Sequence, residues 1–97
     1  MRWVWDAKKN AINQQKHKLS FETAALVFLD PLAVSRRDVY SGEERWQTIG
    51  MIGQVLVLVV HTAPEMESTT GEETGRIIST RKATRYERKI YEENNFE

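Results

Sequence analysis

The strongest constraint on the fold is an almost continuous apolar run from Val55 to Thr62. Valine and leucine alone fill the run up to Val60, so an extended chain here would be apolar on both faces. Runs of this kind are typical of strands that are buried on both sides. We therefore predict a central strand whose side chains alternate between the two faces. One face would carry Val55, Val57, Val59 and His61, and the other Leu56, Leu58, Val60 and Thr62.

The segments around this run predict an antiparallel meander of about four to five strands. Ser41-Gly42-Glu43-Glu44 and Gly53 supply turn residues between the apolar and β-branched stretches. The polar stretch 62–73 contains Pro64 and Gly71, and we expect it to form a mobile hairpin loop. The other strands are expected over 2–5, 32–40, 45–51 and 76–80.

Start signals predict two N-terminal helices and one C-terminal helix. Asp6 and Ser20 are typical N-cap residues, whose side chains accept backbone N–H bonds of the first turn. Thr84 followed by Glu87 matches a capping box at the start of the third helix. The second helix should end at Asp30, because a residue before proline is pushed out of the helical region. The expected helices cover 7–16, 21–29 and 84–93.

Segregated helices and strands predict an α+β fold, with the helices packed on a small antiparallel β-sheet. A chain of 97 residues is long enough for one modest core, so we expect residues 1–97 to form a single domain. We expect residues 94–97 to be a frayed tail. The buried stripe of the third helix would consist of Ala83, Tyr86 and Ile90.

The charges balance over the whole chain but not along it. There are 14 Lys and Arg against 14 Asp and Glu, which by itself argues against a nucleic-acid-binding protein. Basic residues nevertheless dominate 1–18 and 76–89, whereas 63–75 carries glutamates and no base. This distribution predicts a positive face balanced by an acidic loop and tail. The alternative is that these are ordinary solvated surface charges.

Several kinds of site have no support in the sequence. The chain has no cysteine and only His17 and His61, without a helical His-x-x-His pair, so we expect no metal and no cofactor. It contains neither a glycine-rich phosphate loop nor a Gly-x-Ser-x-Gly elbow. No apolar run is long enough for a membrane span or a secretory signal, which predicts a cytoplasmic protein.

The remaining pattern favours phosphate binding. Arginine binds phosphate oxygens through paired N–H donors, and the start of the third helix would add free N–H groups. His61 ends the buried strand, so its ring would lie where the apolar wall meets solvent and could transfer a proton there. The alternative is that His61 only caps the strand edge and that His17 only complements the end of its helix. The arginines that could converge on one sheet face are Arg45, Arg76, Arg81 and Arg85.

Several motifs, taken in order, resemble the BrnT family of toxins. The N-terminal part contributes Trp5-Asp6, Asn10, Asn13, Lys16-His17 and Ser20-Phe21-Glu22. The rest contributes Asp30-Pro31, Gly42-Glu43-Glu44-Arg45-Trp46, His61-Thr62, Arg76-Ile77-Ile78-Ser79, Arg81-Lys82-Ala83, Glu87 and Tyr91-Glu92. The resemblance runs from Trp5 to Glu93, and its specificity lies in the order and spacing of these pieces.

The resemblance implies a RelE-like fold and the toxin half of a bacterial type II toxin–antitoxin system. Members of this family cleave RNA and block translation. Their partner is a BrnA antitoxin with a ribbon-helix-helix domain, and the complex represses its own operon by binding operator DNA. The polar motif positions of the family correspond here to Lys16, His17, Glu22, Arg45, His61, Arg76, Arg81, Arg85 and Tyr91.

We therefore expect an endoribonuclease in which the RNA 2′-hydroxyl attacks the adjacent phosphate without a metal ion. His61, or His17 if it folds nearby, would be the general base or acid. The phosphate and its growing charge would be held by Arg45, Arg76 and Arg81. The RNA would be bound by Lys9, Lys16 and Arg85, and by Tyr91, which we expect to lie exposed late in the third helix.

Two departures from the family pattern bear on this hypothesis. Lys18 stands where the family usually has a glycine that ends the first helix in a left-handed conformation. The acidic loop after Thr62 is longer than usual, and it would shield the site or enlarge the antitoxin interface. Two rival functions also stay open. One is a non-catalytic nucleic-acid- or partner-binding module that acts only in repression, and the other is a purely structural interaction domain.

Overall fold

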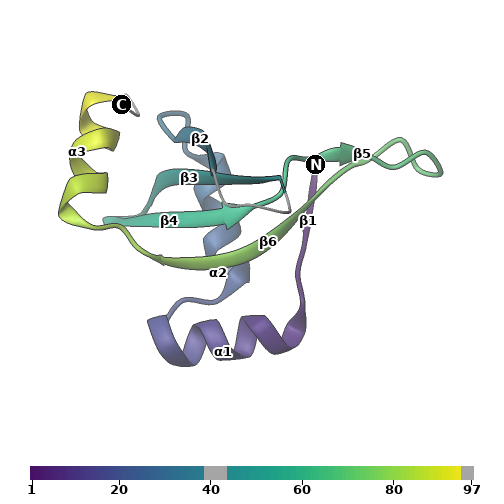
Figure 1. Ribbon diagram of the computed structural model, residues 1–97, viewed down its shortest axis with the longest axis horizontal. Coiled ribbons are helices and arrows are strands. Elements are labelled where there is room, and N and C mark those ends of the chain that lie inside the picture. Colours follow the sequence, from purple (N-terminus) through teal and green to yellow (C-terminus); the bar gives the residue numbers. More distant parts are fainter. Residues whose placement is uncertain (39–43, 95–97) are drawn as a thin grey trace.

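The apolar run forms the middle strand of a six-stranded sheet. The computed structural model describes residues 1–38 and 44–94 (Figure 1). The helices are α1 (Ala7–His17), α2 (Phe21–Ala24), the 3₁₀ helix η1 (Ala25–Leu29) and α3 (Arg85–Glu93). The strands are β1 (Arg2–Val4), β2 (Val34–Asp38), β3 (Arg45–Ile52), β4 (Val55–His61), β5 (Glu65–Met66) and β6 (Glu73–Lys82). The sheet order is β1-β6-β4-β3-β2, with β5 paired to β6.

The position of β4 confirms the prediction of a central strand, because it pairs antiparallel with β3 on one side and β6 on the other. The prediction of a wholly antiparallel sheet is wrong at one edge, where β1 pairs with β6 in parallel. The α+β class holds, but the sheet is mixed. The segment from α1 to η1 carries the chain from β1 to β2, which lies at the opposite edge of the sheet. The following strands pair back across the sheet until β6 lies beside β1, and these two strands run in the same direction.

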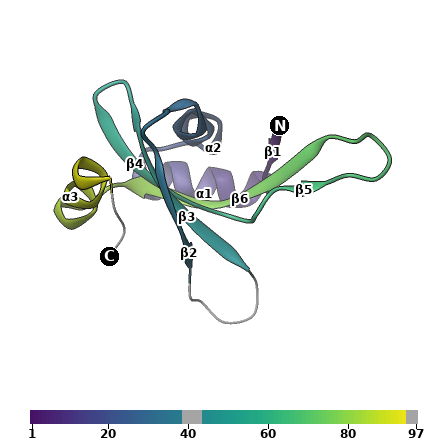
Figure 2. The ribbon, with the colours of Figure 1, turned by 90° about the horizontal axis from the view of Figure 1, so that it is seen from above.

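Helices cover the two faces of the sheet unequally (Figures 1 and 2). On one side, here called the α1 face, α2 and η1 pack on the sheet, and α1 lies along the outer edge of β6. The core on this side contains Leu19, Phe21, Ala24, Val27, Val57, Val59 and Ile77. On the other side, here called the α3 face, α3 covers only one end. The core there contains Ile49, Leu56, Leu58 and Ile90. The rest of the α3 face carries polar and charged side chains.

The three helix starts form as their capping signals predict. Asp6 accepts hydrogen bonds from the backbone N–H groups of Lys8 and Lys9, at 2.8 and 3.0 Å. The hydroxyl of Ser20 accepts a hydrogen bond from the backbone of Thr23 at 3.1 Å. Both halves of the capping box at the start of α3 are present. These caps satisfy N–H groups that have no partner inside their own helices.

The predicted second helix is divided into α2 and η1, and η1 ends at Leu29 with Asp30 as its C-cap. The Asp30 carboxylate joins three parts of the chain. It accepts hydrogen bonds from the backbone of Leu32 and Met51 and from the Tyr91 hydroxyl, at 2.9, 2.8 and 2.7 Å. This contact explains why the predicted stripe of α3 is wrong in one position. Tyr91 packs against the core with Ile90, whereas Tyr86 is 62% exposed.

The stretch after β4 forms a hairpin arm that extends away from the rest of the molecule (Figure 1). β5 pairs with the first residues of β6, and β6 is longer at both ends than the predicted 76–80 strand. The predicted end of β2 after Asp38, the turn over 41–43 and most of the predicted frayed tail lie outside the described residues.

Lys18 ends α1 in the left-handed conformation, with φ 60° and ψ 27°. Its backbone N–H donates to the Gln14 carbonyl at 2.9 Å, which satisfies one of the free carbonyls of the last turn. The helix therefore ends where a glycine would end it, but a lysine Cβ has to be accommodated in a conformation that side chains disfavour.

Lys18→Gly is expected to stabilise the protein by about 1 kcal/mol, because glycine adopts this conformation without the Cβ clash. For a chain of this size the midpoint of thermal unfolding should rise by roughly 4–8 °C. Gln15→Gly, in the exposed middle of α1, is the matched control and should lower stability by about 1 kcal/mol. An unchanged or lower midpoint for Lys18→Gly would contradict the strained helix end.

Candidate functional site

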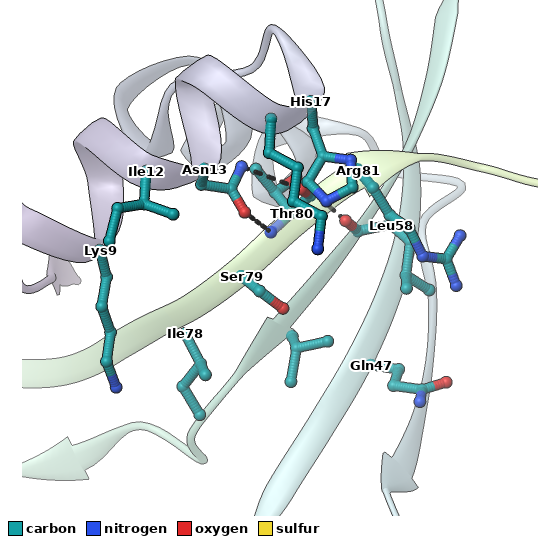
Figure 3. Close-up of a pocket in the computed structure, with 12 residues that line it drawn as sticks. Lys9, Ile12, Asn13, His17, Gln47, Leu58, Ile78, Ser79, Thr80 and Arg81 are labelled. Atoms are coloured by element: carbon teal, nitrogen blue, oxygen red, sulfur yellow. Dashed lines mark hydrogen bonds between the residues drawn. The ribbon is translucent and has the colours of Figure 1, made fainter.

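A hollow of about 470 Å³ lies between α1 and strand β6 and opens onto the α3 face (Figure 3). We call it the α1–β6 hollow. Its wall on α1 is formed by Lys9, Ile12, Asn13, Lys16 and His17. Its wall on the sheet is formed by Gln47, Leu58, Val60 and the β6 residues Ile78, Ser79, Thr80 and Arg81. The hollow thus combines an apolar floor with cationic side chains from two elements.

Asn13 fixes α1 against the free edge of β6. Among residues 1–38 and 44–94, no strand pairs with the outer edge of β6 beyond Arg76, since β1 pairs only as far as that residue. The Asn13 amide takes that place: its Nδ2 donates to the Thr80 carbonyl at 2.9 Å, and its Oδ1 accepts from the Thr80 N–H at 3.2 Å. Nδ2 also donates to the Leu19 carbonyl at 3.1 Å. Asn13 is buried, and its three hydrogen bonds set the spacing between α1 and β6.

A bulge in β6 shapes the sheet side of the hollow. Val60 of β4 pairs with Ser79, but the next residue, His61, pairs with Ile77, so Ile78 is an extra residue in β6. Bulges bend a strand and redirect its side chains, and they are frequent beside functional sites. Ile78 and Ser79 both line the hollow as a result.

Arg81 lies in the hollow with its guanidinium group held by Glu87 of α3. Nη1 and Nη2 donate to the two carboxylate oxygens at 2.8 and 2.9 Å, and Nη1 also donates to the Lys82 carbonyl at 3.3 Å. Burial alone would raise the pKa of Glu87, but hydrogen bonds from Arg81 and Thr84 outweigh it and hold that pKa below its ordinary value. The same pairing raises the pKa of Arg81. Glu87 is therefore a charged anchor that fixes the direction of the Arg81 side chain.

His17 is half-buried in the last turn of α1, on the helix side of the hollow (Figure 3). Within the described residues no hydrogen bond holds its ring. Lys9 and Lys16 line the same wall, one on each side of Asn13 in the sequence. Of the residues proposed from the sequence, the structure brings together Lys9, Lys16, His17 and Arg81.

His61 lies elsewhere, on the α1 face. The ring is only 5% exposed and meets the rings of Trp3 and Phe28 edge to face, at centroid distances of 5.1 and 4.9 Å. The expectation that this ring lies where the apolar wall meets solvent is therefore wrong. Trp3 and Phe28 are distant in sequence but stack on each other beside the end of β4, and so they close over the ring.

The hydrogen bonds of His61 place a proton on Nδ1, and burial favours the neutral ring. Nδ1 lies 2.8 Å from the Thr62 carbonyl, which can only accept, so Nδ1 carries the proton. In the neutral ring, Nε2 accepts from the Thr48 hydroxyl at 2.6 Å, and Thr48 then accepts from the Ser35 hydroxyl at 2.7 Å. Burial lowers the pKa of His61, and the bond to Thr62 only partly opposes this. The arrangement matches the alternative in which His61 is a hydrogen-bonded residue of the strand.

The remaining motif residues do not line the α1–β6 hollow. Arg45 begins β3 opposite Asp38, and Arg76 lines a separate hollow near β1 and the hairpin arm. Arg85 is exposed at the start of α3. The expectation of an exposed Tyr91 is wrong, because its ring packs in the core and its hydroxyl binds Asp30. Glu22 accepts a hydrogen bond from the Asn10 amide at 2.7 Å and so belongs to the α1–α2 junction.

Sequence reasoning missed Gln47, Ser79 and Ile12 as lining residues. Gln47 and Ser79 are polar residues within predicted strands, but the sequence does not reveal which strands pair and in which register. The hairpin arm contributes no residue to the described lining, so the expectation that the acidic loop shields the site is wrong for this hollow.

A family model matches the chain over residues 5–87, and its description is "Ribonuclease toxin, BrnT, of type II toxin-antitoxin system". The chain belongs to the BrnT family. No curated protein matches the chain. The match includes Lys9, Lys16, His17 and Arg81, so the part of this BrnT toxin that forms the hollow lies within the family region. As the toxin of a type II system, the protein has an antitoxin partner.

The described part of this BrnT toxin contains no cluster of three or more His, Cys, Asp or Glu residues that could hold a metal ion. Likewise, no helix in residues 1–38 and 44–94 is both long and apolar enough to cross a membrane.

Asn13→Ala is expected to destabilise the protein by about 2–4 kcal/mol, because it leaves the Thr80 N–H and buried carbonyls without partners. Gln14→Ala, at an exposed position on the same helix, should change stability by less than about 0.5 kcal/mol. Urea unfolding measures both. Equal midpoints for the two variants would show that Asn13 does not hold α1 on the sheet.

Protonation of His61 should destabilise the folded protein. Its pKa is lowered in the folded state, so its contribution to stability is complete above the unfolded pKa of about 6.5 and is lost as the pH falls below it. The loss should approach about 1.4 kcal/mol per pH unit. The pKa values of Glu22, Asp30 and Glu87 are lowered from ordinary values that are already below 5. Between pH 7 and 5 the change in stability should therefore come from His61 and not from these carboxylates.

The measurement is urea unfolding between pH 7 and 5 for the wild type and two variants. His61→Gln should be less stable at pH 7 but should lose the pH dependence. His17→Gln should keep it. A wild type with constant stability over this range would contradict the assignment.

Proposed function

We propose that this BrnT toxin is an endoribonuclease that cleaves RNA at the α1–β6 hollow. The observation that carries the proposal is the convergence of Lys16, His17 and Arg81 on one hollow within the region matched by a ribonuclease family. These side chains supply the two kinds of group that phosphodiester cleavage needs. One is a residue that transfers protons near neutral pH, and the others are cations for the phosphate.

In the proposed reaction the RNA 2′-hydroxyl is the nucleophile. His17 takes the proton from the 2′-oxygen, which forms a new bond to the adjacent phosphorus, and the bond from phosphorus to the 5′-oxygen breaks. The leaving 5′-oxygen takes a proton from water, so the products end in a 2′,3′-cyclic phosphate and a 5′-hydroxyl. The nucleophile belongs to the substrate itself, and therefore no metal-activated water is required.

Arg81 is suited to the charge that grows on the phosphate. A guanidinium group has five N–H donors, and the bonds to Glu87 and Lys82 occupy three of them. The Nε–H and one Nη2–H remain for two phosphate oxygens, in the paired geometry that arginine uses for phosphate. The anchor on Glu87 holds this pair in place before the substrate arrives. Lys16 adds a second positive charge from the opposite wall.

His17 replaces His61 as the proposed proton-transfer group. The ring of His61 is buried on the α1 face, and its two nitrogens are engaged by Thr62 and Thr48. We propose a structural role for His61, and we assign no contact with RNA to Arg45, Arg76, Arg85 or Tyr91 at this hollow.

The wider role follows from the family. We propose that residues 1–97 act as one RelE-like domain in the cytoplasm, where RNA cleavage inhibits translation. We further propose that the antitoxin is a BrnA-like protein with a ribbon-helix-helix domain, and that the complex represses its own operon by binding operator DNA. The acidic hairpin arm is available to such a partner, since it extends away from the rest of the molecule (Figure 1).

The test is cleavage of a labelled RNA by toxin that has been separated from its antitoxin. His17→Gln should lower the cleavage rate by roughly 10²–10⁴-fold, the usual contribution of a general base. Arg81→Lys should also lower the rate, because an ammonium cannot form the paired bonds. Arg88→Gln removes an exposed charge from α3 and is the matched control, with a rate close to that of the wild type. His61→Gln, assayed at a temperature where urea unfolding shows it to be folded, should keep its activity.

The products and the effect of EDTA separate this function from its rivals. Cleavage should persist in EDTA and yield cyclic phosphate ends. Loss of activity in EDTA, or 3′-hydroxyl ends, would refute the mechanism. A protein that binds RNA without cleaving it, and whose expression does not arrest growth, would be the non-catalytic binding module. No effect of any of these variants on growth arrest would favour the purely structural domain.

A further inference from the structure

Gln47 lies between two hollows on the α3 face. It lines the α1–β6 hollow, and it also lines a second hollow of about 290 Å³ at the outer strand β2. We call the second one the β2 hollow. Its other described lining residues are Arg36, Arg37 and Asp38. The two hollows therefore meet at one side chain, and a ligand in the first can continue into the second.

The strand register shows that this connection is a straight row of side chains. Arg36 of β2 pairs with Gln47 of β3, which pairs with Val60 of β4, which pairs with Ser79 of β6. Directly paired residues point to the same face of a sheet. Neighbouring strands lie about 4.8 Å apart, so the row crosses about 14 Å from β2 to β6. We call these four residues the cross-strand row.

The next row of paired side chains toward α3 is buried and cannot contact a ligand. Ile49 and Leu58 pair with each other there and are buried under Ile90 of α3. The C-terminal helix thus forms a wall along one side of the cross-strand row. On the far side of Ser79, the row reaches the cations of α1.

The chemistry along the row matches a single-stranded polynucleotide. Cations stand at both ends, with Arg36 at β2 and with Lys9 and Lys16 on α1, whereas Gln47, Val60 and Ser79 form a middle that is polar and apolar but uncharged. Phosphates suit the ends, and an unstacked base suits the middle. The bases of a duplex are stacked and paired, so they cannot lie flat on this surface. The carboxylate of the β2 hollow, Asp38, lies directly opposite Arg45 in the register.

We infer that the cross-strand row is a second subsite for single-stranded RNA, adjoining the cleavage hollow. In this subsite Arg36 binds the phosphate of a nucleotide beyond the scissile bond, and Gln47 contacts the edge of the base between them. Arg36 donates from Nε to the Gln47 Oε1 at 3.3 Å, which turns the Gln47 NH₂ group toward an acceptor on the base. This inference rests on the proposed ribonuclease function, and it adds a length requirement and a base preference.

The experiment compares substrates of different length with the full-length toxin. A dinucleotide with one scissile phosphate reaches only the α1–β6 hollow, whereas a hexanucleotide also reaches the cross-strand row. Arg36→Gln should weaken binding and cleavage of the hexanucleotide by about tenfold and leave the dinucleotide within about twofold of wild type. The dependence of hexanucleotide affinity on salt should fall by about one phosphate contact. Arg88→Gln, which removes an exposed charge outside the row, should affect neither substrate.

Gln47→Ala tests the base contact separately. Hexanucleotides that differ only in the base next to the scissile bond should be cleaved at different rates by the wild type, and the variant should reduce this difference by about fivefold. Gln54→Ala, in the exposed turn between β3 and β4, is its matched control. An unchanged base preference in Gln47→Ala would overturn the role of Gln47.

The outcomes that overturn the subsite differ from those that overturn the function. If Arg36→Gln lowers activity on both lengths equally, or on neither, there is no second subsite, although cleavage itself still stands. Equal affinity for duplex and single-stranded RNA would also refute the subsite. If Arg36→Gln weakens binding of the purified antitoxin but not of RNA, the row is a protein interface. If the wild type cleaves no RNA at all, the proposed function fails first.

Discussion

The pairing of Asn13 with the edge of β6 is the interaction on which the candidate site depends. A strand edge without a partner exposes N–H and carbonyl groups, and in most proteins another strand, a helix or a charged residue covers it. Here a single buried amide supplies a donor and an acceptor to Thr80, as a neighbouring strand would. Because Asn13 belongs to a helix, the surface beside the edge is lined by the side chains of that helix. This contact therefore helps to bring the cations of α1 to the sheet.

The unequal covering of the sheet gives each face a separate role. The α1 face holds most of the core, including His61 between two aromatic rings. The α3 face is closed at one end by Ile90 and Tyr91 and keeps its polar residues accessible on the rest. Arg81 connects the covered end of the α3 face with its accessible part, since its side chain lines the hollow and is bound to Glu87 of α3. The same helix that completes the second core thus also positions a residue of the site.

Local signals in the sequence were sufficient for much of the fold. The apolar run, the three N-caps and the Asp30-Pro31 helix end depend on neighbouring residues, and each is confirmed. The parallel pairing of β1 and the burial of His61 depend on segments far apart in sequence. The alternation of β4 placed His61 on the correct face, but it could not show that Trp3 and Phe28 close over the end of that strand.

The candidate site was predictable only in part for the same reason. The basic character of 1–18 and 76–89 drew attention to Lys9, Lys16 and Arg81, and the family resemblance added His17. Of the four arginines expected to converge on one sheet face, the strand register places Arg45, Arg76 and Arg81 on the α3 face, but only Arg81 lines the α1–β6 hollow. Gln47 has no distinguishing local pattern, and only its place between two hollows makes it a candidate.

The extra residue in β6 also limits how the chain length can vary. Ile77 and Thr80 both point into the core, although they are an odd number of residues apart, and Ser79 and Arg81 point to the opposite face. Deleting one residue between Ile77 and Thr80 would restore strict alternation along β6. Either the residues before the deletion or those after it would then point to the wrong face of the sheet. Insertions and deletions here should therefore be much rarer than substitutions. The number of residues between Arg76 and Arg81 therefore determines which side chains of β6 face the site.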